Sequence, residues 1–419
     1  MQEVAIIGGG AAGLFTALYL KYQLIKEDID DVAIIIYERL ERTGKKLLAT
    51  GNGRCNLSNS KVNKDKYNNP EFVKSFIKQF GFKDLKDFLY QMGLYITTDE
   101  VGRAYPHSET ANTVLDVLRT KIKQYDIEER CNSEVKKLTK FRNKFVIETV
   151  LNQKFIADYV VMTTGGKAAE IHGSNGSGYT LLKSLKHKVI EPKPGLVSIK
   201  TDEQLVKGLS GVRVKAHVSL YERKKKEIVW NEAGEVLFKN DGLSGIVIMQ
   251  VSSFIQHNPG SYFINLDLYP NILWDDLFND LKKRTKDLAD LEVPQILLGM
   301  FPKMVSMSIL KRAKVDLGGR VKDLKDRDIA RIINTIKEFS FEYKGTQDFD
   351  KAQVTIGGID VTEVSNKSLE SKKIENLYIA GELLDIDGEC GGFNLHWAFA
   401  SGVAVAKDLV KKIRDFEDD

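Results

Sequence analysis

The stretch that most constrains the fold is AIIGGGAAG, residues 5–13, which joins an apolar strand-like run to a helix-prone run. Its glycines have the spacing Gly8-x-Gly10-x-x-Gly13. In a strand–turn–helix unit the first glycine allows a tight turn, the second lets the backbone approach a pyrophosphate, and the third lets the helix pack closely on the strand. The phosphates then lie at the positive helix N-terminus. The sequence therefore predicts a dinucleotide-binding unit.

An acidic residue follows the second apolar run at the position that such a unit requires. Residues 32–37 form this run, and Glu38 comes directly after it. A carboxylate at the end of the second strand accepts hydrogen bonds from the adenosine ribose hydroxyls and disfavours a 2′-phosphate. We expect Glu38 to have this role, and this motif alone leaves FAD and NAD both open.

Composition sets limits on size and partners. A chain of 419 residues with 42% hydrophobic residues and 33 glycines can bury a large core over two or three domains. The formal net charge is only +4, so no nucleic-acid partner is expected. The basic cluster at residues 223–226 predicts a solvated hairpin turn.

Neither a membrane span nor a metal site is expected. No apolar run reaches the roughly 18 residues that cross a bilayer, and the chain starts with a strand-like run, so we expect a cytoplasmic protein. Cys55, Cys131 and Cys390 are odd in number and lack CxxC spacing, which argues against a disulfide framework and against zinc.

The first part of the chain alternates helical and strand patterns. Residues 44–60 are polar and glycine-rich and predict a functional loop. Two amphipathic helical stretches follow at 70–93 and 110–126, with a loop at 99–109 between them. Residues 133–164 predict a β-meander that returns to a buried strand and a Thr-Gly turn.

The pattern changes in the middle of the chain. Residues 191–265 alternate polar and apolar and predict an antiparallel barrel or sandwich, and residues 272–338 predict helices. Glycine turns at 357–360 precede a buried strand at 377–382 and a last helix from about 394 to 413. Because that strand resembles the first one, we expect the chain to return to its opening sheet. The expected domains are a nucleotide-binding domain at 1–190 and 355–419, a β-barrel domain at 191–270 and 339–354, and a helical domain at 271–338.

The C-terminal motif, residues 380–402, is the second strong signal. Its strand ends in Gly381-Glu382, and a Gly391-Gly392 turn opens the last helix. Such a turn presents free backbone N–H groups and the positive end of the helix dipole. In a flavoprotein, N1 and O2 of the isoalloxazine lie there, with Glu382 near the ribityl chain and pyrophosphate. The alternative is an ordinary acidic turn that caps a helix.

The third signal is GNGRCNLSN, residues 51–59. Polar amides, an arginine and a cysteine between glycines pack poorly and favour ligand contact, although a surface loop held by its own side chains remains an alternative. Arg54 could offset pyrophosphate or substrate charge. Residues 172–185 again place glycines before a helix, but without a strand and GxGxxG spacing they indicate no separate NAD(P) domain.

Taken together, GGGAAGL, GKKLLATGNGRCNLSN, the 173–185 segment, GLSG at 242–245 and the C-terminal motif resemble the bacterial FAD-binding oxidoreductases of the aminoacetone oxidase and BaiN type. The resemblance covers nearly the whole chain. It implies an α/β fold, with a glutathione-reductase-like FAD-binding Rossmann domain split by an inserted antiparallel β-barrel and a helical domain. It also implies non-covalent FAD, and GLSGIVIMQ resembles the branch that includes a bile-acid enone reductase.

The motifs define an expected cofactor site. The residues expected to contact FAD are Gly8, Gly10, Ala11, Ala12, Gly13, Glu38, Arg39, Lys45, Lys46, Gly51, Asn52, Gly53, Arg54, Cys55, Asn56, Val135, Thr164, Gly165, Gly166, Gly381, Glu382, Gly391, Gly392, Phe393 and Asn394. Candidates for proton transfer or substrate contact are His396, Cys390, Cys55, Tyr105 and His107.

The expected function is hydride transfer through FAD to or from a small organic substrate, with NAD(P)H as a transient co-substrate if the reaction is enone reduction. An oxygen-using oxidase of an aminoacetone-like amine is one alternative. A flavin-dependent RNA-modifying protein and a flavin-binding protein without turnover are two others. Substrate, redox partner and oligomeric state stay open.

Overall fold

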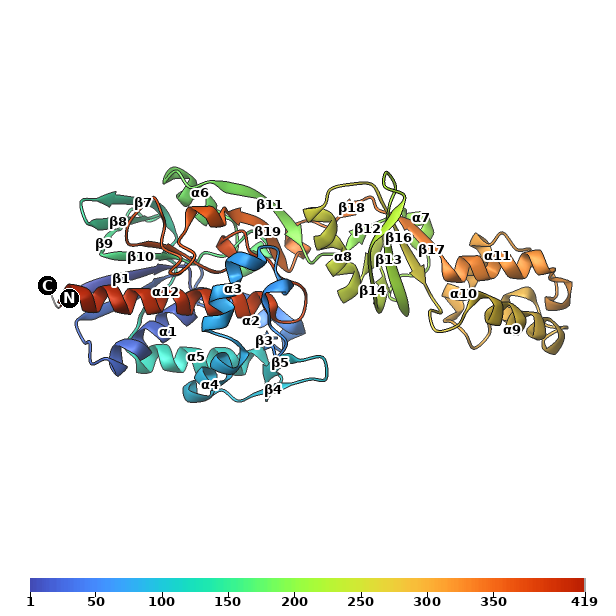
Figure 1. Cartoon of the computed structure of the whole chain (residues 1–419), viewed down its shortest axis with the longest axis horizontal. Helices are drawn as coiled ribbons and strands as arrows, with labels where there is room; N and C mark the ends of the chain where they lie inside the picture. Colours follow the sequence, from blue (N-terminus) through green and yellow to red (C-terminus); the bar gives the residue numbers. More distant parts are fainter. Residues whose placement is uncertain (418–419) are drawn as a thin grey trace. The chain divides into compact units, whose positions relative to one another are not determined.

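The computed structural model describes residues 1–417 and divides the chain into two compact units (Figure 1). Unit 1 consists of Met1–Gly195 together with the chain from Phe349 onward, and unit 2 is Leu196–Asp348. Unit 2 is therefore a single insertion into the sequence of unit 1.

Unit 1 is built on a five-stranded parallel sheet. In spatial order its strands are β20 (Leu377–Ile379), β10 (Tyr159–Met162), β1 (Gln2–Ile7), β2 (Val32–Tyr37) and β6 (Glu128–Arg130). Ile7 pairs with Tyr37 on one side and with Met162 on the other, and Met162 pairs with Ile379. The carboxyl ends of four strands thus meet at one edge of the sheet. The expected return of the chain to its opening sheet is confirmed.

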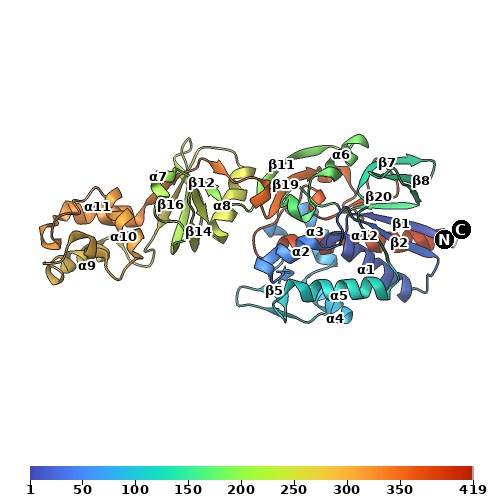
Figure 2. The same ribbon diagram turned by 180° about the vertical axis from the view of Figure 1, so that it is seen from behind.

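Helices cover one face of this sheet and a meander lies against the other (Figures 1 and 2). The helices are α1 (Ala11–Lys26), α5 (Ala111–Gln124) and α12 (Phe393–Glu417), and the meander strands are β7 (Val135–Phe141), β8 (Lys144–Thr149) and β9 (Lys154–Ala157). α1 and α12 pack closely because Gly402 lacks a side chain: a Cβ there would lie 2.8 Å from Thr16 Oγ1 and 2.9 Å from the Ala12 carbonyl oxygen. The rings of Phe15 and Phe399 stack across the same contact, 4.2 Å apart.

The remaining elements of unit 1 surround the carboxyl edge or the helices. They are α2 (Lys45–Ala49), β3 (Ser58–Asn59), α3 (Pro70–Gln79), α4 (Phe82–Met92), β4 (Ile96–Thr98), β5 (Arg103–Pro106), α6 (Ser177–Ser184), β11 (Val189–Gly195) and β19 (Val354–Ile359). The expected loop at 44–60 therefore begins with a short helix, and the expected loop at 99–109 contains β5, which pairs with β3 and β4.

The prediction of a glycine turn at 357–360 is wrong, because Gly357 and Gly358 lie inside β19. Both have left-handed φ, +85° and +139°. A Cβ on Gly357 would lie 2.5 Å from the Glu191 carbonyl oxygen, and one on Gly358 would lie 2.7 Å from that of Leu383. Gly357 lets β11 approach closely, and Gly358 lets the turn after β20 approach closely. A single sequence does not distinguish such an approach from a turn.

Unit 2 contains a seven-stranded antiparallel sheet. In spatial order its strands are β17 (Phe339–Glu342), β16 (Tyr262–Asp267), β13 (Arg213–Glu222), β14 (Glu227–Phe238), β15 (Gly242–Ser244), β12 (Ile199–Lys200) and β18 (Gly345–Thr346). The basic turn at 223–226 joins β13 to β14, as expected. Within the described chain the edge strands β17 and β18 are not paired with each other, so a closed barrel is not confirmed.

Two helices lie where only strands were expected. The short α7 (Glu203–Val206), which follows β12 of the sheet, and α8 (Ile246–His257) both fall inside the 191–265 segment. Val247, Val251 and Ile255 recur every four residues along α8 and are buried. This helical period was present in the sequence but was masked by the alternating strands on either side.

The expected helical segment of unit 2 forms α9 (Trp274–Asp287), α10 (Lys303–Arg312) and α11 (Asp326–Lys337). Their buried side chains, such as Leu277, Ile309 and Ile333, belong to the same hydrophobic cluster as Phe339 of the sheet. A division of unit 2 into separate barrel and helical domains stays a prediction.

Candidate cofactor-binding site

The three glycines of the turn after β1 differ in their surroundings. Gly8, with φ +107°, donates its N–H to the Tyr37 carbonyl oxygen at 2.8 Å. A Cβ on Gly13 would lie 2.0 Å from the Gly8 carbonyl oxygen, whereas a Cβ on Gly10 would meet nothing within 4 Å. The first turn of α1, which starts at Ala11 and Ala12, has no acidic residue and no side-chain cap. Open space at an uncapped helix N-terminus fits a pyrophosphate.

Glu38 holds the same turn from the end of β2. Its Oε2 accepts the Gly9 N–H at 2.9 Å and its Oε1 accepts the Leu40 N–H at 2.8 Å. The side chain is buried, and burial raises its pKa while these two hydrogen bonds lower it. Each carboxylate oxygen keeps a second acceptor position, so the expected ribose hydrogen bonds are compatible with this geometry.

The surroundings of Glu38 bring other expected residues to the same edge. Ser133 donates its N–H to the Glu38 carbonyl oxygen at 2.8 Å, which places Val135, the buried first residue of β7, two residues from this contact. Arg39 Nη1 donates to the Gly173 carbonyl oxygen at 3.3 Å. The glycine-rich segment that starts at Gly173 thus lies beside the end of β2.

The turn after β10 supports the phosphate turn from the other side. Thr163 Oγ1 donates to the Gly8 carbonyl oxygen at 2.8 Å. Thr164 Oγ1 is buried and has no hydrogen-bond partner among residues 1–417. Gly165 has φ +71°, and a Cβ on Gly166 would lie 2.2 Å from Thr355 Oγ1.

The second and third sequence motifs form one structure at the start of α12. Gly391 and Gly392 have φ +123° and +99°, and a Cβ on Gly392 would lie 2.3 Å from the Ser58 carbonyl oxygen. The amide oxygen of Asn56 accepts the Gly392 N–H at 3.1 Å, in the side-chain orientation that satisfies both ends of the amide. Asn59 Nδ2 donates to the Gly391 carbonyl oxygen at 3.1 Å. The 51–59 loop therefore shapes the helix N-terminus expected at the flavin.

The loop itself is strained. Gly51, Asn52, Gly53 and Cys55 all have left-handed φ, and for the two non-glycine residues this conformation costs free energy. Asn52 and Gly53 are exposed. Strained, exposed backbone of this kind clusters at functional sites, which agrees with a ligand-contact loop.

Arg54 is held in place at the edge of this loop. Its guanidinium lies 4.5 Å from the centre of the Tyr105 ring and 3.9 Å from the Glu109 carboxylate. The Arg54 side chain is 43% exposed, while Tyr105 is buried beneath it. Tyr105 therefore serves as a platform for a cation that stays accessible to an anionic group.

Glu382 connects three elements. Its Oε2 forms an ion pair with Lys46 of α2 at 2.7 Å, and its Oε1 accepts the Thr355 N–H of β19 at 2.8 Å. Gly381, with φ +71°, accepts a hydrogen bond from Trp397 Nε1 at 3.1 Å. The neighbouring Lys45 pairs with Glu41 instead.

Thr355 is a site residue that sequence reasoning missed. Besides donating its N–H to Glu382, it accepts at Oγ1 the N–H groups of Lys167 and Ala168, at 2.7 and 3.0 Å. It therefore joins the Thr-Gly turn to Glu382. The only signal in the sequence is a single hydroxyl within the buried run Val354–Ile359.

Two proton-transfer candidates do not fit that role. His396 is fully buried; its Nδ1 lies 2.8 Å from Ser58 Oγ and its Nε2 lies 3.0 Å from the Phe80 carbonyl oxygen. Burial lowers its pKa to about 4. Cys55 is also fully buried, and burial raises the pKa of its thiol to about 11. A neutral imidazole bonded at both nitrogens and a buried thiol are structural groups.

The structure gives the positions of the other expected site residues but does not decide their roles. His107 is exposed after β5, and Cys390 is half-buried beside the Gly391 turn. Phe393 is buried, and Asn394 both accepts the Gly388 N–H and donates to the Gly388 carbonyl oxygen, each at 2.8 Å. Contact of all these residues with a cofactor stays a prediction.

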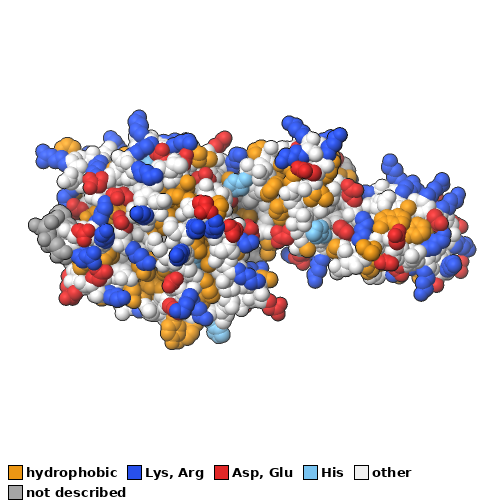
Figure 3. Space-filling model, in the orientation of Figure 1, with side chains coloured by type: hydrophobic (Ala, Val, Ile, Leu, Met, Phe, Trp, Pro, Cys, Tyr) orange, Lys and Arg blue, Asp and Glu red, His pale blue; other side chains and the backbone are white. Residues whose placement is uncertain are grey.

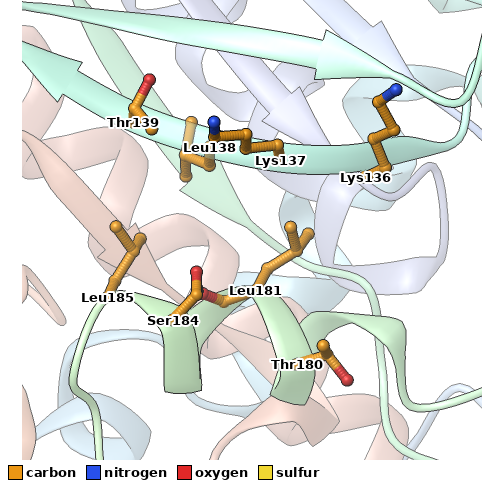
Figure 4. Close-up of a pocket in the computed structure, with 8 residues that line it drawn as sticks. All are labelled: Lys136, Lys137, Leu138, Thr139, Thr180, Leu181, Ser184 and Leu185. Carbon is orange, nitrogen blue, oxygen red and sulfur yellow. Dashed lines mark hydrogen bonds between the residues drawn. The ribbon is translucent and has the colours of Figure 1, made fainter.

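A separate cavity of about 440 Å³ lies between β7 and α6 (Figure 4). Residues 136–139 of β7 line it together with Thr180, Leu181, Ser184 and Leu185 of α6. None of the expected cofactor-binding residues lines this cavity, so it is not part of the glycine-loop site.

Across residues 1–417, no three His, Cys, Asp or Glu side chains are arranged to hold a metal ion. In the same range, none of the helices has the length and apolar character that crossing a membrane requires.

These features define a mixed α/β protein with a Rossmann-type dinucleotide-binding domain. They are the parallel sheet, the glycine turn after β1, the acidic residue at the end of β2 and the open N-terminus of α1. The chain belongs to the family described as HI0933-like protein Rossmann domain, whose model matches residues 2–408. The expected membership among bacterial FAD-dependent oxidoreductases is confirmed, and the chain is an enzyme of that class with a Rossmann-type FAD-binding domain.

Two named relatives match nearly the whole chain. A 3-dehydro-bile acid delta(4,6)-reductase of Clostridium scindens is 32% identical over 98% of this chain and 100% of the relative. A ribosomal RNA dihydrouridine synthase of Escherichia coli is 28% identical over 97% of this chain and 98% of the relative. Among solved structures, a 3-ketosteroid delta1-dehydrogenase of Sterolibacterium denitrificans has a TM-score of 0.47 at 10% identity, covering 98% of this chain and 100% of that one.

Proposed function

We propose that this chain is an FAD-dependent reductase that saturates a carbon–carbon double bond conjugated with a carbonyl group, with NAD(P)H as the reductant. One observation carries the proposal: the full-length relatives are named for that type of reaction. The double bonds that start at C4 and C6 of a 3-dehydro bile acid are conjugated with its 3-ketone, and dihydrouridine is uridine whose conjugated 5,6-double bond is saturated. The shared chemistry is narrower than the class of flavin-dependent oxidoreductases.

The residues at the carboxyl edge of the sheet supply complementary contacts for the cofactor. The open space at Gly10 and the N-terminus of α1 would hold the pyrophosphate, and Glu38 the adenosine ribose. The Gly391–Gly392 turn would place the N-terminus of α12 at the pyrimidine side of the flavin, where a positive dipole favours negative charge. FAD held by these residues would supply the hydride-transfer chemistry, with NAD(P)H as the proposed reductant.

A small organic substrate is favoured over RNA. Lys, Arg, Asp and Glu side chains are interspersed over the surface shown in Figure 3 rather than gathered by sign. With a net charge of +4, the chain lacks the basic field that RNA binding usually requires. Reduction of a uridine in RNA remains the second candidate, because two full-length relatives are named ribosomal RNA dihydrouridine synthases.

Anaerobic flavin reoxidation tests the proposal. The FAD-loaded chain is reduced with NADH or NADPH, and bleaching of the visible flavin bands is followed. A 4,6-dien-3-one steroid is then added, with the saturated 3-ketone as matched control and an unmodified ribosomal RNA transcript as a second arm. The proposal predicts that the flavin bands return with the dienone and not with the saturated ketone.

The other outcomes separate the alternatives. Return of the bands with the transcript alone, together with dihydrouridine in the product, would support the second candidate. Bleaching of oxidised flavin by aminoacetone, with no bleaching by either nicotinamide, would support an amine oxidase and overturn the proposal.

A further inference from the structure

We propose that the cavity between β7 and α6 binds an extended, acidic peptide segment of a partner protein, which joins the meander sheet as a strand beside β7. The cavity lies wholly within unit 1, and none of the residues expected to contact FAD lines it. The proposal therefore concerns an interaction surface and does not depend on the reaction that the enzyme performs.

β7 is an edge strand with one open side. It is the first strand of the sheet β7–β8–β9 and pairs with β8 alone. Across residues 1–417, the backbone of Val135–Phe141 forms no backbone hydrogen bond with any other segment. In a strand that is paired on one side, every second residue directs its N–H and C=O groups away from the partner strand. These groups can pair with one further strand.

The cavity runs along this open side. Four consecutive residues of β7, residues 136–139, line it. Because successive side chains of a strand point to opposite faces, a cavity lined by consecutive residues follows the edge of the strand. Four residues span about 13 Å, so a volume of about 440 Å³ corresponds to a cross-section of roughly 33 Å². This cross-section suits one extended chain, since paired strands lie about 4.8 Å apart.

α6 provides the opposite wall. Its lining residues have the spacing of one stripe on a helix, and Leu181 and Leu185 of this stripe reach toward β7 (Figure 4). Leu138 of β7 lines the same space and is buried. An added strand gains affinity from its main-chain hydrogen bonds and specificity from pockets for alternate side chains. The three leucines form such a pocket, so every second side chain of the peptide should be apolar.

A β-bulge places two lysines at the cavity. The register between β7 and β8 shifts between Val135 and Lys137. The extra residue leaves Lys136 and Lys137 both exposed. Lys136 forms an ion pair with Glu148 at 2.9 Å, whereas in residues 1–417 no carboxylate lies within 4.0 Å of Lys137 Nζ. The outward-facing side chains of the peptide should therefore be acidic.

The charge near the cavity also selects between possible occupants. The hydrogen bond from Lys136 and the charges of Lys154 and Lys137 lower the pKa of Glu148. One carboxylate thus faces three ammonium groups, and the excess positive charge is complementary to an acidic segment. The same lysines would repel β7 of a second copy of this chain, because like charges on neighbouring strands are destabilising. A different, acidic protein is therefore the expected partner.

Fluorescence anisotropy with a labelled peptide tests the proposal on the FAD-loaded full chain. The peptide Glu-Val-Glu-Val-Glu-Val, blocked at both ends, alternates acidic and apolar side chains and should bind. Lys-Val-Lys-Val-Lys-Val, its charge-reversed control, should not. Two further controls carry methyl groups on the backbone nitrogens of all valines or of all glutamates. One of these two sets of N–H groups must face β7, so at least one control should bind about 10-fold more weakly or worse.

Variants of exposed residues locate the binding site. Lys137→Glu should weaken binding of the acidic peptide about 5-fold or more, because it replaces attraction by repulsion. Lys183→Glu makes the same change of charge on an exposed residue of α6 that does not line the cavity, and it should have a smaller effect. Ser184→Trp places an indole at the cavity wall and should abolish binding. In the unchanged protein, the bound peptide should slow amide hydrogen exchange at residues 135–141.

Several outcomes would overturn the proposal. No binding of the acidic peptide up to about 1 mM would do so. Equal binding of the parent peptide and both methylated peptides would exclude pairing with the edge of β7. Unchanged binding by Ser184→Trp would place the peptide elsewhere. If 8-anilinonaphthalene-1-sulfonate binds to the unchanged protein but not to Ser184→Trp, and the peptide binds to neither, the cavity is a small-molecule site and the peptide assignment is wrong.

Discussion

Gly10 and Gly13 lie three positions apart but differ in what surrounds them. Gly10→Val should leave the protein folded and unable to retain FAD, because the added side chain enters space that the protein leaves empty and that a pyrophosphate needs. We expect its free energy of unfolding without FAD to change by less than about 1 kcal/mol. Denaturant titration and the visible spectrum of the purified variant measure the two effects.

Gly13→Val is the matched comparison. Its Cβ would lie 2.0 Å from the Gly8 carbonyl oxygen, so α1 must move away from β1, and we expect a loss of about 3 kcal/mol or more. A Gly10→Val protein that purifies with a full complement of FAD would show that the cofactor lies elsewhere.

His396 makes stability depend on pH. Its pKa is about 4 in the folded protein and about 6.5 when unfolded, so the unfolded chain binds the proton more tightly. The contribution of His396 to the free energy of unfolding is fully present above about pH 6.5. It is lost as the pH falls toward 4, by up to about 3 kcal/mol. Urea unfolding across this range should show a weaker pH dependence for His396→Gln. The exposed His107→Gln serves as control, and an unchanged slope in His396→Gln would contradict the assignment.

At the scale of elements, the close contact between the 51–59 loop and the start of α12 depends on Gly392. Gly392→Ala combines a left-handed φ of +99° with a Cβ 2.3 Å from the Ser58 carbonyl oxygen. Gly93→Ala has a similar φ, +95°, but its Cβ meets nothing within 4 Å. We expect about 1 kcal/mol of destabilisation for Gly93→Ala and about 3 kcal/mol or more for Gly392→Ala. Thermal unfolding of the two variants checks the difference, and equal losses would mean that the loop yields to the added methyl group.

Patterns local in sequence predicted the elements that matter most for the cofactor. The glycine spacing at 8–13, the acidic residue at 38 and the apolar run at 377–382 were enough to predict that β1, β2 and β20 share one sheet and that α1 follows β1. The helix α8 was missed because strands flank it, and Gly357 and Gly358 were read as a turn because a glycine does not reveal whether it bends the chain or lets another strand approach.

Contacts that join distant segments could not be predicted in the same way. The pairing of Glu382 with Lys46 and Thr355 links residues whose spacing in the sequence carries no periodic signal. Burial likewise decided the role of His396, since the same imidazole on an exposed helix face would titrate freely.

For the whole molecule, the position of the insertion predicts that unit 1 can exist without unit 2. β11 and β19 pair in antiparallel fashion, with Gly195 opposite Val354, and β11 contacts the turn that begins at Phe349. Replacing residues 196–348 by about six Gly/Ser residues, which reach roughly 13 Å, should close the chain. All residues expected to contact FAD lie in unit 1, so the shortened protein should be yellow.

Flavin absorption and a single cooperative unfolding transition measure this outcome. The full-length chain is the control for FAD content. A shortened chain that folds but binds no flavin would mean that residues 196–348 contribute to cofactor binding.

The β11–β19 pair also bears on how the inserted unit can be exchanged. Because both crossings between the units fall at the end of one two-stranded ribbon, a gene segment that encodes an unrelated insert can be exchanged between two points in the coding sequence without altering the nucleotide-binding core. Recombination at these points would leave every residue expected to contact FAD unchanged, because all of them lie in unit 1. Chimeras made at residues 195 and 349 would therefore measure what residues 196–348 contribute to the reaction.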